Sequence, residues 1–311
     1  MAMLIDIGLP AWMSDESLRD HLKSLLPQAD IRTAADPGDP ADIEMLVLTR
    51  RGDSGFDIYP NLALVQKLGA GVEQLAAAPD LAAHVRITRL KSDQPAREIA
   101  EYSLAWVLAE QRQIRQYLGD QAQHRWEPVP PGRSQDITVG ILGLGHIGSR
   151  TARLFRAVDM SVIGWSRTEK SLPGIECLNG RQGLFQLIEN SDYVISILPS
   201  TPETRNLFNQ DLFRRMKDDA VLINAGRGDL IVEDDLIDAL DTGLLRGAVL
   251  DVFHTEPLPR DHAFWDHPAV VITPHVSGWH LDDGLPDVAE NYRRLKNGES
   301  LLNEVDRNAG Y

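Results

Sequence analysis

Reactive side chains follow three consecutive apolar segments in the last third of this sequence. Residues 220–224 lead into Ala225-Gly226-Arg227-Gly228, residues 247–250 lead into Asp251 and on to Glu256, and residues 270–273 lead into Pro274-His275. Because ligands of parallel sheets bind outside the carboxyl ends of the strands, these side chains are expected at one edge. Each alone is better explained as an ordinary loop, turn or capping residue, but together they favour a functional site.

The three residue types suit the reduction of a ketone beside a carboxylate. The planar fork of Arg227 can hold a carboxylate and polarise the adjacent carbonyl. When hydride arrives at the ketone carbon, a protonated histidine such as His275 can give a proton to the oxygen. A neighbouring carboxylate, Glu256, would stabilise the imidazolium and keep the acid form present near neutrality.

A glycine-rich turn predicts where a dinucleotide binds. Residues 137–142 form an apolar run that leads into Gly143-Leu144-Gly145-His146-Ile147-Gly148, and an amphipathic helix is expected next. In this pattern the first glycine permits a tight turn, the second admits a pyrophosphate close to the backbone, and the third allows the helix to pack on the strand. Free amides at the helix start, around His146 and Ile147, would face the anion.

The residues after the next apolar run bear on cofactor choice. An acidic residue there normally binds the ribose hydroxyls of NAD, but this sequence has Ser166-Arg167-Thr168. A hydroxyl and an arginine can donate to a 2′-phosphate, so the sequence predicts that NADPH is preferred and that NADH remains possible. The alternative is that Arg167 and Lys170 are ordinary solvated charges beside Glu169.

Two α/β domains are expected to position these groups. From Asp136 onward, apolar runs alternate with helical segments, which predicts a doubly wound parallel Rossmann-type sheet over residues 99–280. Residues 1–98 hold strands at 3–8, 44–49, 63–69 and 85–90 and a helix over 14–26, so this part is predicted to be a smaller α/β domain. One long helix is predicted over about 96–118, and a last helix over about 285–297 is predicted to return residues 281–311 to the first domain.

Composition excludes several classes of function. The formal net charge of −15 repels phosphate backbones and anionic membranes, so neither nucleic acid nor a membrane is expected as a partner. The lone Cys177 allows no internal disulfide, and no secretory leader or apolar run of membrane-spanning length is visible, so we expect a cytoplasmic protein. The nine histidines show no metal-ligand spacing, so no metal is expected.

The sequence resembles the D-isomer-specific 2-hydroxyacid dehydrogenase family over most of its length. The resemblance is carried by the stretch from Asn224 to Pro259, by WDHPAVVITPH, and by KLGAGVE, REIAEYSL, GLGHIG and LPSTPETRNL. It implies that Arg227 binds the substrate carboxylate and carbonyl, that His275 is the general acid/base, and that Glu256 pairs with His275. It also implies a flavodoxin-like fold for the smaller, substrate-binding domain and a homodimer formed through the helix beginning near Ala96. Further residues are implied to contact ligands: Leu198, Pro199, Thr204, Ala225 and Asp251 for the cofactor, with Asp251 on the nicotinamide carboxamide, and the amides of Ala70 and Gly71 for the substrate carboxylate.

Several alternatives remain at this stage. Glu256 argues against a formate dehydrogenase, and the short tail after Asn297 argues against a phosphoglycerate dehydrogenase with a regulatory domain. The pattern is most similar to the glyoxylate/hydroxypyruvate reductase branch, which implies a small 2-oxo acid as substrate. A nucleotide-sensing corepressor of the same fold, without turnover, is the alternative from another class. Arg50 or Arg51 would add charge to the pocket, and Trp279 would either cap it or pack under the last helix.

Overall fold

The chain divides into two compact units. The computed structural model describes residues 2–8, 13–50 and 55–307. Unit 1 comprises Met1–Gln94 and Trp279–Tyr311, and unit 2 comprises Pro95–Gly278. The boundaries predicted from the sequence lie at 98/99 and 280/281, and the substrate and cofactor roles given to the two parts stay predictions.

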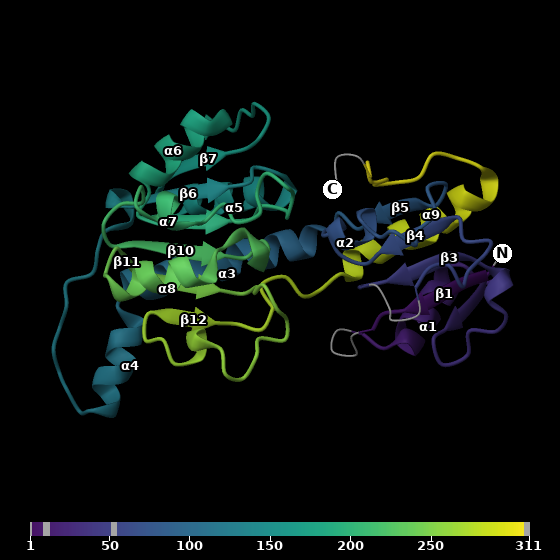
Figure 1. Ribbon diagram of the computed structural model, residues 1–311, viewed down its shortest axis with the longest axis horizontal. Coiled ribbons are helices and arrows are strands. Elements are labelled where there is room, and N and C mark those ends of the chain that lie inside the picture. The colour runs from purple at the N-terminus through teal and green to yellow at the C-terminus, as the bar shows by residue number, and fades with distance from the viewer. Residues whose placement is uncertain (1, 9–12, 51–54, 308–311) are drawn as a thin grey trace. The chain divides into compact units, whose positions relative to one another are not determined.

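Unit 1 is built on a parallel sheet of five strands (Figure 1). Its strands are β1 (Ala2–Asp6), β2 (Asp30–Thr33), β3 (Ile43–Leu48), β4 (Leu64–Lys67) and β5 (Arg86–Arg89), and its helices are α1 (Asp15–Leu25), α2 (Glu73–Ala76) and α9 (Leu285–Asn297), with short 3-10 turns at Pro40–Asp42 and Asp282–Gly284. The order β2-β1-β3-β4-β5 is the flavodoxin-like order, which confirms the predicted fold class of this unit. The sequence prediction missed β2, because only Ile31 among its four residues is apolar.

The segment after residue 280 completes the core of unit 1. Helix α9 buries Leu285, Val288 and Ala289 in the same apolar cluster as Leu18 and Leu22 of α1. Helix α9 is also bonded to the sheet, since the side-chain amide of Asn291 donates to Gln66 of β4, which also accepts from Thr88 of β5. All three polar side chains are almost fully buried, so their hydrogen bonds offset the cost of removing them from water.

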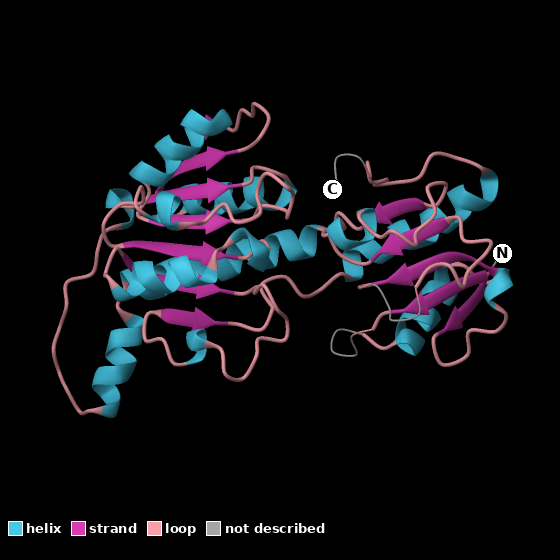
Figure 2. Ribbon diagram, in the orientation of Figure 1, coloured by secondary structure: helices cyan, strands magenta, loops and turns pink. Residues whose placement is uncertain are grey.

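Unit 2 contains a parallel sheet of seven strands with helices on both faces (Figures 1 and 2). Its strands are β6 (Thr138–Leu142), β7 (Ser161–Trp165), β8 (Glu176–Leu178), β9 (Tyr193–Ser196), β10 (Ala220–Asn224), β11 (Leu245–Leu250) and β12 (Val270–Ile272). Its helices are α3 (Asp93–Gln111), which begins in unit 1, α4 (Ile114–Ala122), α5 (His146–Ala157), α6 (Gly180–Asn190), α7 (Gln210–Phe213) and α8 (Glu233–Asp241), with 3-10 turns at Ser134–Asp136, Gly228–Leu230 and Ala263–Trp265. The order β12-β11-β10-β9-β6-β7-β8 reverses between β9 and β6, as in a doubly wound Rossmann sheet, so the predicted fold class is confirmed. The short edge strand β8 was not predicted.

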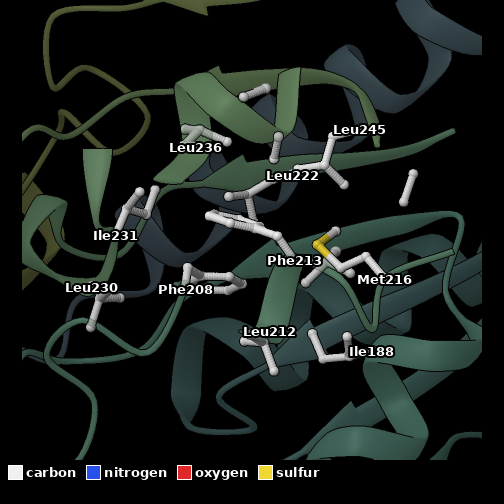
Figure 3. Packing of buried hydrophobic residues seen from close by; sticks show 14 of the residues in the cluster. Ile188, Phe208, Leu212, Phe213, Met216, Leu222, Leu230, Ile231, Leu236 and Leu245 are labelled. Atoms are coloured by element: carbon white, nitrogen blue, oxygen red, sulfur yellow. The ribbon is translucent and has the colours of Figure 1, made fainter. Parts of the chain in front are cut away.

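Alternate residues of the central strands pack into two separate apolar cores, one on each face of the sheet. In β10, Leu222 joins the cluster formed with α6, α7 and α8, while Val221 and Ile223 join the cluster on the opposite face with α3 and α5. Phe208 and Phe213 lie at the centre of the first cluster, with ring centroids 6.3 Å apart (Figure 3). Burial on both faces explains why these strands appear in the sequence as unbroken apolar runs.

The single long helix predicted over 96–118 is wrong. The structure has α3 and α4, and Gln113 between them adopts a left-handed φ of 55°. The amide of Gln113 donates to the carbonyl of Glu110, which is a tighter 3-10 pattern that ends α3. No proline or glycine marks the break, so the local sequence carried no signal for it.

Candidate functional site

The structure brings Arg227, Glu256 and His275 together at the carboxyl edge of the unit 2 sheet. Arg227 follows β10, Glu256 lies in the segment after β11, and His275 follows β12. Nδ1 of His275 and Oε2 of Glu256 are 2.8 Å apart. The charge of Arg227 also acts on the Glu256 carboxylate. Three neighbouring strands therefore end in one group of a cation, a carboxylate and an imidazole.

Glu256 stays ionised because its partners outweigh its burial. Burial by itself raises the pKa of Glu256. The hydrogen bond and charge of His275, the backbone amide of Phe253 at 3.0 Å from Oε1, and the charge of Arg227 act in the other direction, and the net pKa is lowered. A lowered pKa means that the Glu256 carboxylate is charged at neutral pH, and the stability that this charge contributes is lost as pH falls through the pKa of Glu256 in the folded protein.

A buried carboxylate shapes the segment that carries His275. Asp251 is fully buried, Oδ1 accepts from the Thr273 hydroxyl at 2.6 Å and the Val276 amide at 2.9 Å, and Oδ2 accepts from the Ser277 amide at 2.9 Å. His275 has a φ of 56°, and its amide donates to the Asp251 carbonyl. Left-handed backbone is unfavourable for a side-chain-bearing residue, so these bonds hold His275 in a conformation it would otherwise rarely adopt.

Two functional residues of this network were missed from the sequence. The single hydroxyl hydrogen of Thr273 goes to Asp251, so the hydroxyl of Tyr102, 2.8 Å away, donates to Thr273. Burial raises the pKa of Tyr102, which keeps it a neutral donor. Tyr102 lies on α3, and its 171-residue separation from Thr273 in sequence explains why no local pattern revealed the pair.

A further missed residue, Asn224, shapes the loop of Arg227. Asn224 is the last residue of β10 and is fully buried. Its side-chain amide donates to the Arg227 carbonyl at 2.8 Å, and its oxygen accepts from the Gly226 amide at 3.1 Å. A Cβ at Gly228 would lie 1.9 Å from the backbone of Phe253, so only glycine permits the close approach of this loop to the segment after β11.

The glycine turn after β6 has the geometry that a dinucleotide needs. Gly143 has a φ of 106°, and a Cβ at Gly148 would lie 1.8 Å from the Gly143 carbonyl oxygen, so α5 packs tightly on the turn. A Cβ at Gly145 would meet nothing within 4 Å. Gly145 is the N-cap of the 12-residue α5, and no side chain caps it. The first turn of α5 therefore begins without a side-chain cap beside an open glycine, which is the setting in which helix-start amides bind a pyrophosphate.

The loop after β7 is organised by its own hydroxyl. Ser166 is buried and its Oγ donates to the carbonyl of Thr168 at 2.7 Å. The pKa of Glu203 is lowered, mainly by a hydrogen bond from Thr201. The nearby charge of Arg167 lowers it further by a smaller amount. Because the Ser166 hydrogen is used inside the loop, Arg167 and Thr168 are the residues of this set that stay candidates for donating to a phosphate.

The remaining cofactor candidates lie beside these loops. Thr204 closes the turn after β9, since its hydroxyl donates to the Pro199 carbonyl at 2.6 Å and accepts from the Thr201 amide at 2.8 Å. Leu198 and Ala225 are buried. The side chain of Leu198 lies 3.4 Å from where a Cβ of Gly143 would be, so it packs on the glycine turn.

The candidate substrate residues Ala70 and Gly71 lie in unit 1, after β4. Among the described residues their amides donate to no protein acceptor, while Arg89 donates to the Ala70 carbonyl at 3.2 Å and Lys67 donates to the Leu68 carbonyl at 2.7 Å. Cations thus hold the carbonyls of this loop. The guanidinium of Arg50 donates to the Gly8 carbonyl, Trp279 is half-buried, and Arg51 lies outside the described residues.

The described residues contain neither a membrane-spanning helix nor a cluster of metal ligands. No helix among them is long and apolar enough to span a membrane. In the same part of the chain, no group of three or more His, Cys, Asp or Glu side chains could hold a metal ion.

Comparison with known proteins identifies the family. Residues 104–277 match the model of the D-isomer specific 2-hydroxyacid dehydrogenase, NAD binding domain. The chain is 38% identical over 296 residues to a glyoxylate/hydroxypyruvate reductase A of Serratia proteamaculans, covering 93% of this chain and 94% of that protein.

Solved structures agree over the whole chain. A D-isomer specific 2-hydroxyacid dehydrogenase of Xanthobacter autotrophicus in complex with NADPH is 35% identical, with a TM-score of 0.92 and coverage of 100% of this chain and 99% of that one. An NADPH-dependent glyoxylate/hydroxypyruvate reductase of Sinorhizobium meliloti, in complex with NADP and sulfate, is 32% identical, with a TM-score of 0.90 and the same coverage. This chain belongs to the D-isomer specific 2-hydroxyacid dehydrogenase family, which confirms the resemblance seen in the sequence.

The Glu256–His275 pair predicts a specific pH dependence. Replacing Glu256 with Gln removes the charge that stabilises the His275 imidazolium, so the proton should be lost at lower pH. We expect the alkaline limb of the reduction rate to move to lower pH, by an amount limited by the partial solvation of the pair. The measurement is kcat/KM against pH. Asp261→Asn, an exposed charge change in the same segment, is the matched control and should leave the limb in place. An unmoved limb in Glu256→Gln would show that the pair does not govern the proton.

Proposed function

We propose that this chain is an NADPH-dependent reductase of small 2-oxo acids, with glyoxylate and hydroxypyruvate as the first candidates. The observation that carries the proposal is the 2.8 Å pair of Glu256 and His275 beside Arg227, at the edge of a sheet whose first turn is shaped for a pyrophosphate. The names of the relatives, glyoxylate/hydroxypyruvate reductases, support it, and two solved relatives are complexes with NADPH or NADP. A sensor without turnover is not favoured.

His275, Glu256 and Arg227 have separate roles in the proposed reduction. NADPH, when bound, supplies the hydride that reaches the ketone carbon. Since Nδ1 of His275 faces Glu256, Nε2 is the nitrogen that gives a proton to the carbonyl oxygen, and Glu256 stabilises the charged ring before the transfer. Arg227 binds the carboxylate of the substrate and polarises its carbonyl. One hydride and one proton convert the 2-oxo acid to the 2-hydroxy acid.

Further contacts are proposed for the other candidate residues. The amides of Ala70 and Gly71 would bind the substrate carboxylate. The amides that start α5 would hold the pyrophosphate, Arg167 and Thr168 the 2′-phosphate, and the turn of Leu198, Pro199 and Thr204 would border the cofactor together with Ala225. Asp251 has one of its four lone pairs left for the nicotinamide carboxamide, because three are used within the protein.

A homodimer formed through α3 and α4 remains part of the proposal. Large apolar side chains are exposed on α4 and just after it, at Ile114, Leu118 and Trp126, the last being 95% exposed. Exposed side chains of this size support an interaction surface in this part of the chain. Sedimentation should give about twice the chain mass of 34.6 kDa, and a monomer at micromolar concentration would contradict this. The cytoplasmic location expected from the sequence stays a prediction.

The function is tested by a panel of carbonyl substrates. With NADPH, glyoxylate, hydroxypyruvate and pyruvate should be reduced, whereas their uncharged aldehyde or ketone counterparts should not. Arg227→Lys keeps the charge but loses the bidentate fork, so it should raise KM and lower kcat together. The measurement is NADPH oxidation followed by absorbance. Equal reduction of charged and uncharged substrates would refute the role of Arg227, and no reduction of any 2-oxo acid would refute the function.

The loop after β7 predicts the cofactor preference. A charge-assisted hydrogen bond from Arg167 to the 2′-phosphate contributes about 1.5–3 kcal/mol, so NADPH should be preferred at least about tenfold. The double change Ser166→Asp with Arg167→Ala should reverse the preference, because a carboxylate accepts from ribose hydroxyls and repels the phosphate. Arg181→Ala, a change on α6, is the control. A preference for NADH in the unaltered protein at both moderate and high salt would show that Arg167 does not bind the phosphate.

A further inference from the structure

The segment that carries Glu256 is mostly exposed between two fixed ends. We define the Glu256 loop as residues 253–262. It starts at the buried Phe253 and ends at His262, which begins the turn Ala263–Trp265, and most residues in between are exposed. The Glu256 side chain is itself 36% exposed. Its place beside His275 therefore depends on how the two ends of the loop are held.

Both ends of the loop meet one carboxylate. Glu233 is the first residue of α8, and its Oε1 accepts from the His254 amide at 3.3 Å. Its Oε2 lies 3.2 Å from Nε2 of His262. We call this arrangement the Glu233 bridge. Its two side chains are only 25% and 19% exposed, so water screens the contact little.

The ring of His262 is oriented for this contact. Its Nδ1 accepts from the Phe264 amide at 3.2 Å, so the hydrogen of the neutral ring lies on Nε2 and points at Glu233. The ring also packs on Phe264, with centroids 4.6 Å apart, and Phe264 is buried in the core. The far end of the Glu256 loop is thereby tied both to the core and to α8.

The proposed chemistry uses none of these groups, yet they adjoin it directly. Oε1 of Glu256 accepts from the Phe253 amide, one residue before the amide that Glu233 holds. The charged groups acting on the Glu256 carboxylate are His275 and Arg227. We propose that Glu233 is a positioning residue, which bridges both ends of the Glu256 loop and so keeps Glu256 on His275. This inference rests on the proposed function.

An acidic residue in the first turn of a helix also has an ordinary explanation, since it interacts favourably with the helix dipole. Asp234 shares that first turn, carries the same charge and is exposed. Asp234→Ala therefore removes the same interaction with the dipole while it leaves the bridge intact. It is the matched control for Glu233→Ala.

The first measurement needs no catalysis. In Glu233→Ala, backbone amides of residues 253–262 should exchange with deuterium at least about tenfold faster than in the unaltered protein, because the loop has lost the contact that joins its ends. In Asp234→Ala their exchange should be unchanged. Equal exchange in Glu233→Ala and Asp234→Ala would overturn the bridge as a constraint on the loop.

The second measurement tests whether the Glu233 bridge affects proton transfer from His275. Glu233→Ala should lower kcat about ten- to hundredfold and move the alkaline limb to lower pH, the direction expected for Glu256→Gln, with NADPH affinity unchanged. Glu233→Gln can accept from only one end of the loop and should fall in between. His262→Phe, which keeps the ring contact but not the Nε2 donor, provides a second variant in case Glu233→Ala does not fold. In a Glu256→Gln background, Glu233→Ala should cause no further shift.

The outcomes separate this inference from the proposed function. If Glu233→Ala and His262→Phe lost the same fraction of rate at every pH, the alkaline limb would be unmoved. That result would indicate a merely structural role and would overturn this inference alone. A limb unmoved by Glu256→Gln would refute the proposed role of the Glu256–His275 pair and this inference with it, but not the reduction itself. An unaltered protein that reduces no 2-oxo acid would refute the proposed function.

Discussion

The buried carboxylate of Asp251 is the constraint on which the candidate site depends. A carboxylate removed from water must be surrounded by donors, and here the donors come from the segment that follows the next strand, β12. Satisfying this one group fixes residues 273–277 and places His275 with a left-handed backbone. The hydroxyls of Tyr102 and Thr273 extend the network to α3. The backbone conformation of His275 is therefore fixed by Asp251, Thr273 and Tyr102, which would not touch a substrate.

The other two reactive groups are placed by similar means. Asn224, at the end of β10, holds both ends of the turn that presents Arg227, and Gly228 lets that turn approach Phe253 closely. Glu256 is oriented by the Phe253 amide and by His275 itself. Each strand end thus supplies one reactive group, and the buried side chains of Asn224 and Asp251 fix the segments that carry Arg227 and His275. Positioning of this kind lets a site stabilise developing charge without reorganising.

Much of this arrangement could be predicted from the sequence because the signals are local. Apolar runs separated by helical segments predict parallel sheets, and the glycine turn lies directly after such a run, so the fold class was predicted correctly. The carboxyl-edge rule predicts that Arg227, Glu256 and His275 meet, and the structure places them together, although their roles stay predictions. Short edge strands were missed, because β8 has three residues and β2 has four, and neither shows an apolar run.

The supporting residues could not be predicted in this way. Tyr102 and Thr273, or Glu233 and His262, are distant in sequence, and nothing in their local pattern distinguishes them from surface polar residues. Gln113 ends a helix through backbone geometry that its residue type does not favour. Only the folded chain shows which polar side chains share a buried partner.

The most direct test of the account is the effect of His275→Gln on turnover and on cofactor binding. Glutamine can still donate a hydrogen bond but cannot give up a proton near neutrality. We expect kcat for a 2-oxo acid to fall at least about a hundredfold, while the dissociation constant of NADPH, measured by fluorescence, stays within about twofold because the glycine turn and the loop after β7 are untouched. Turnover close to that of the unaltered protein would contradict the assignment of His275 as the proton donor.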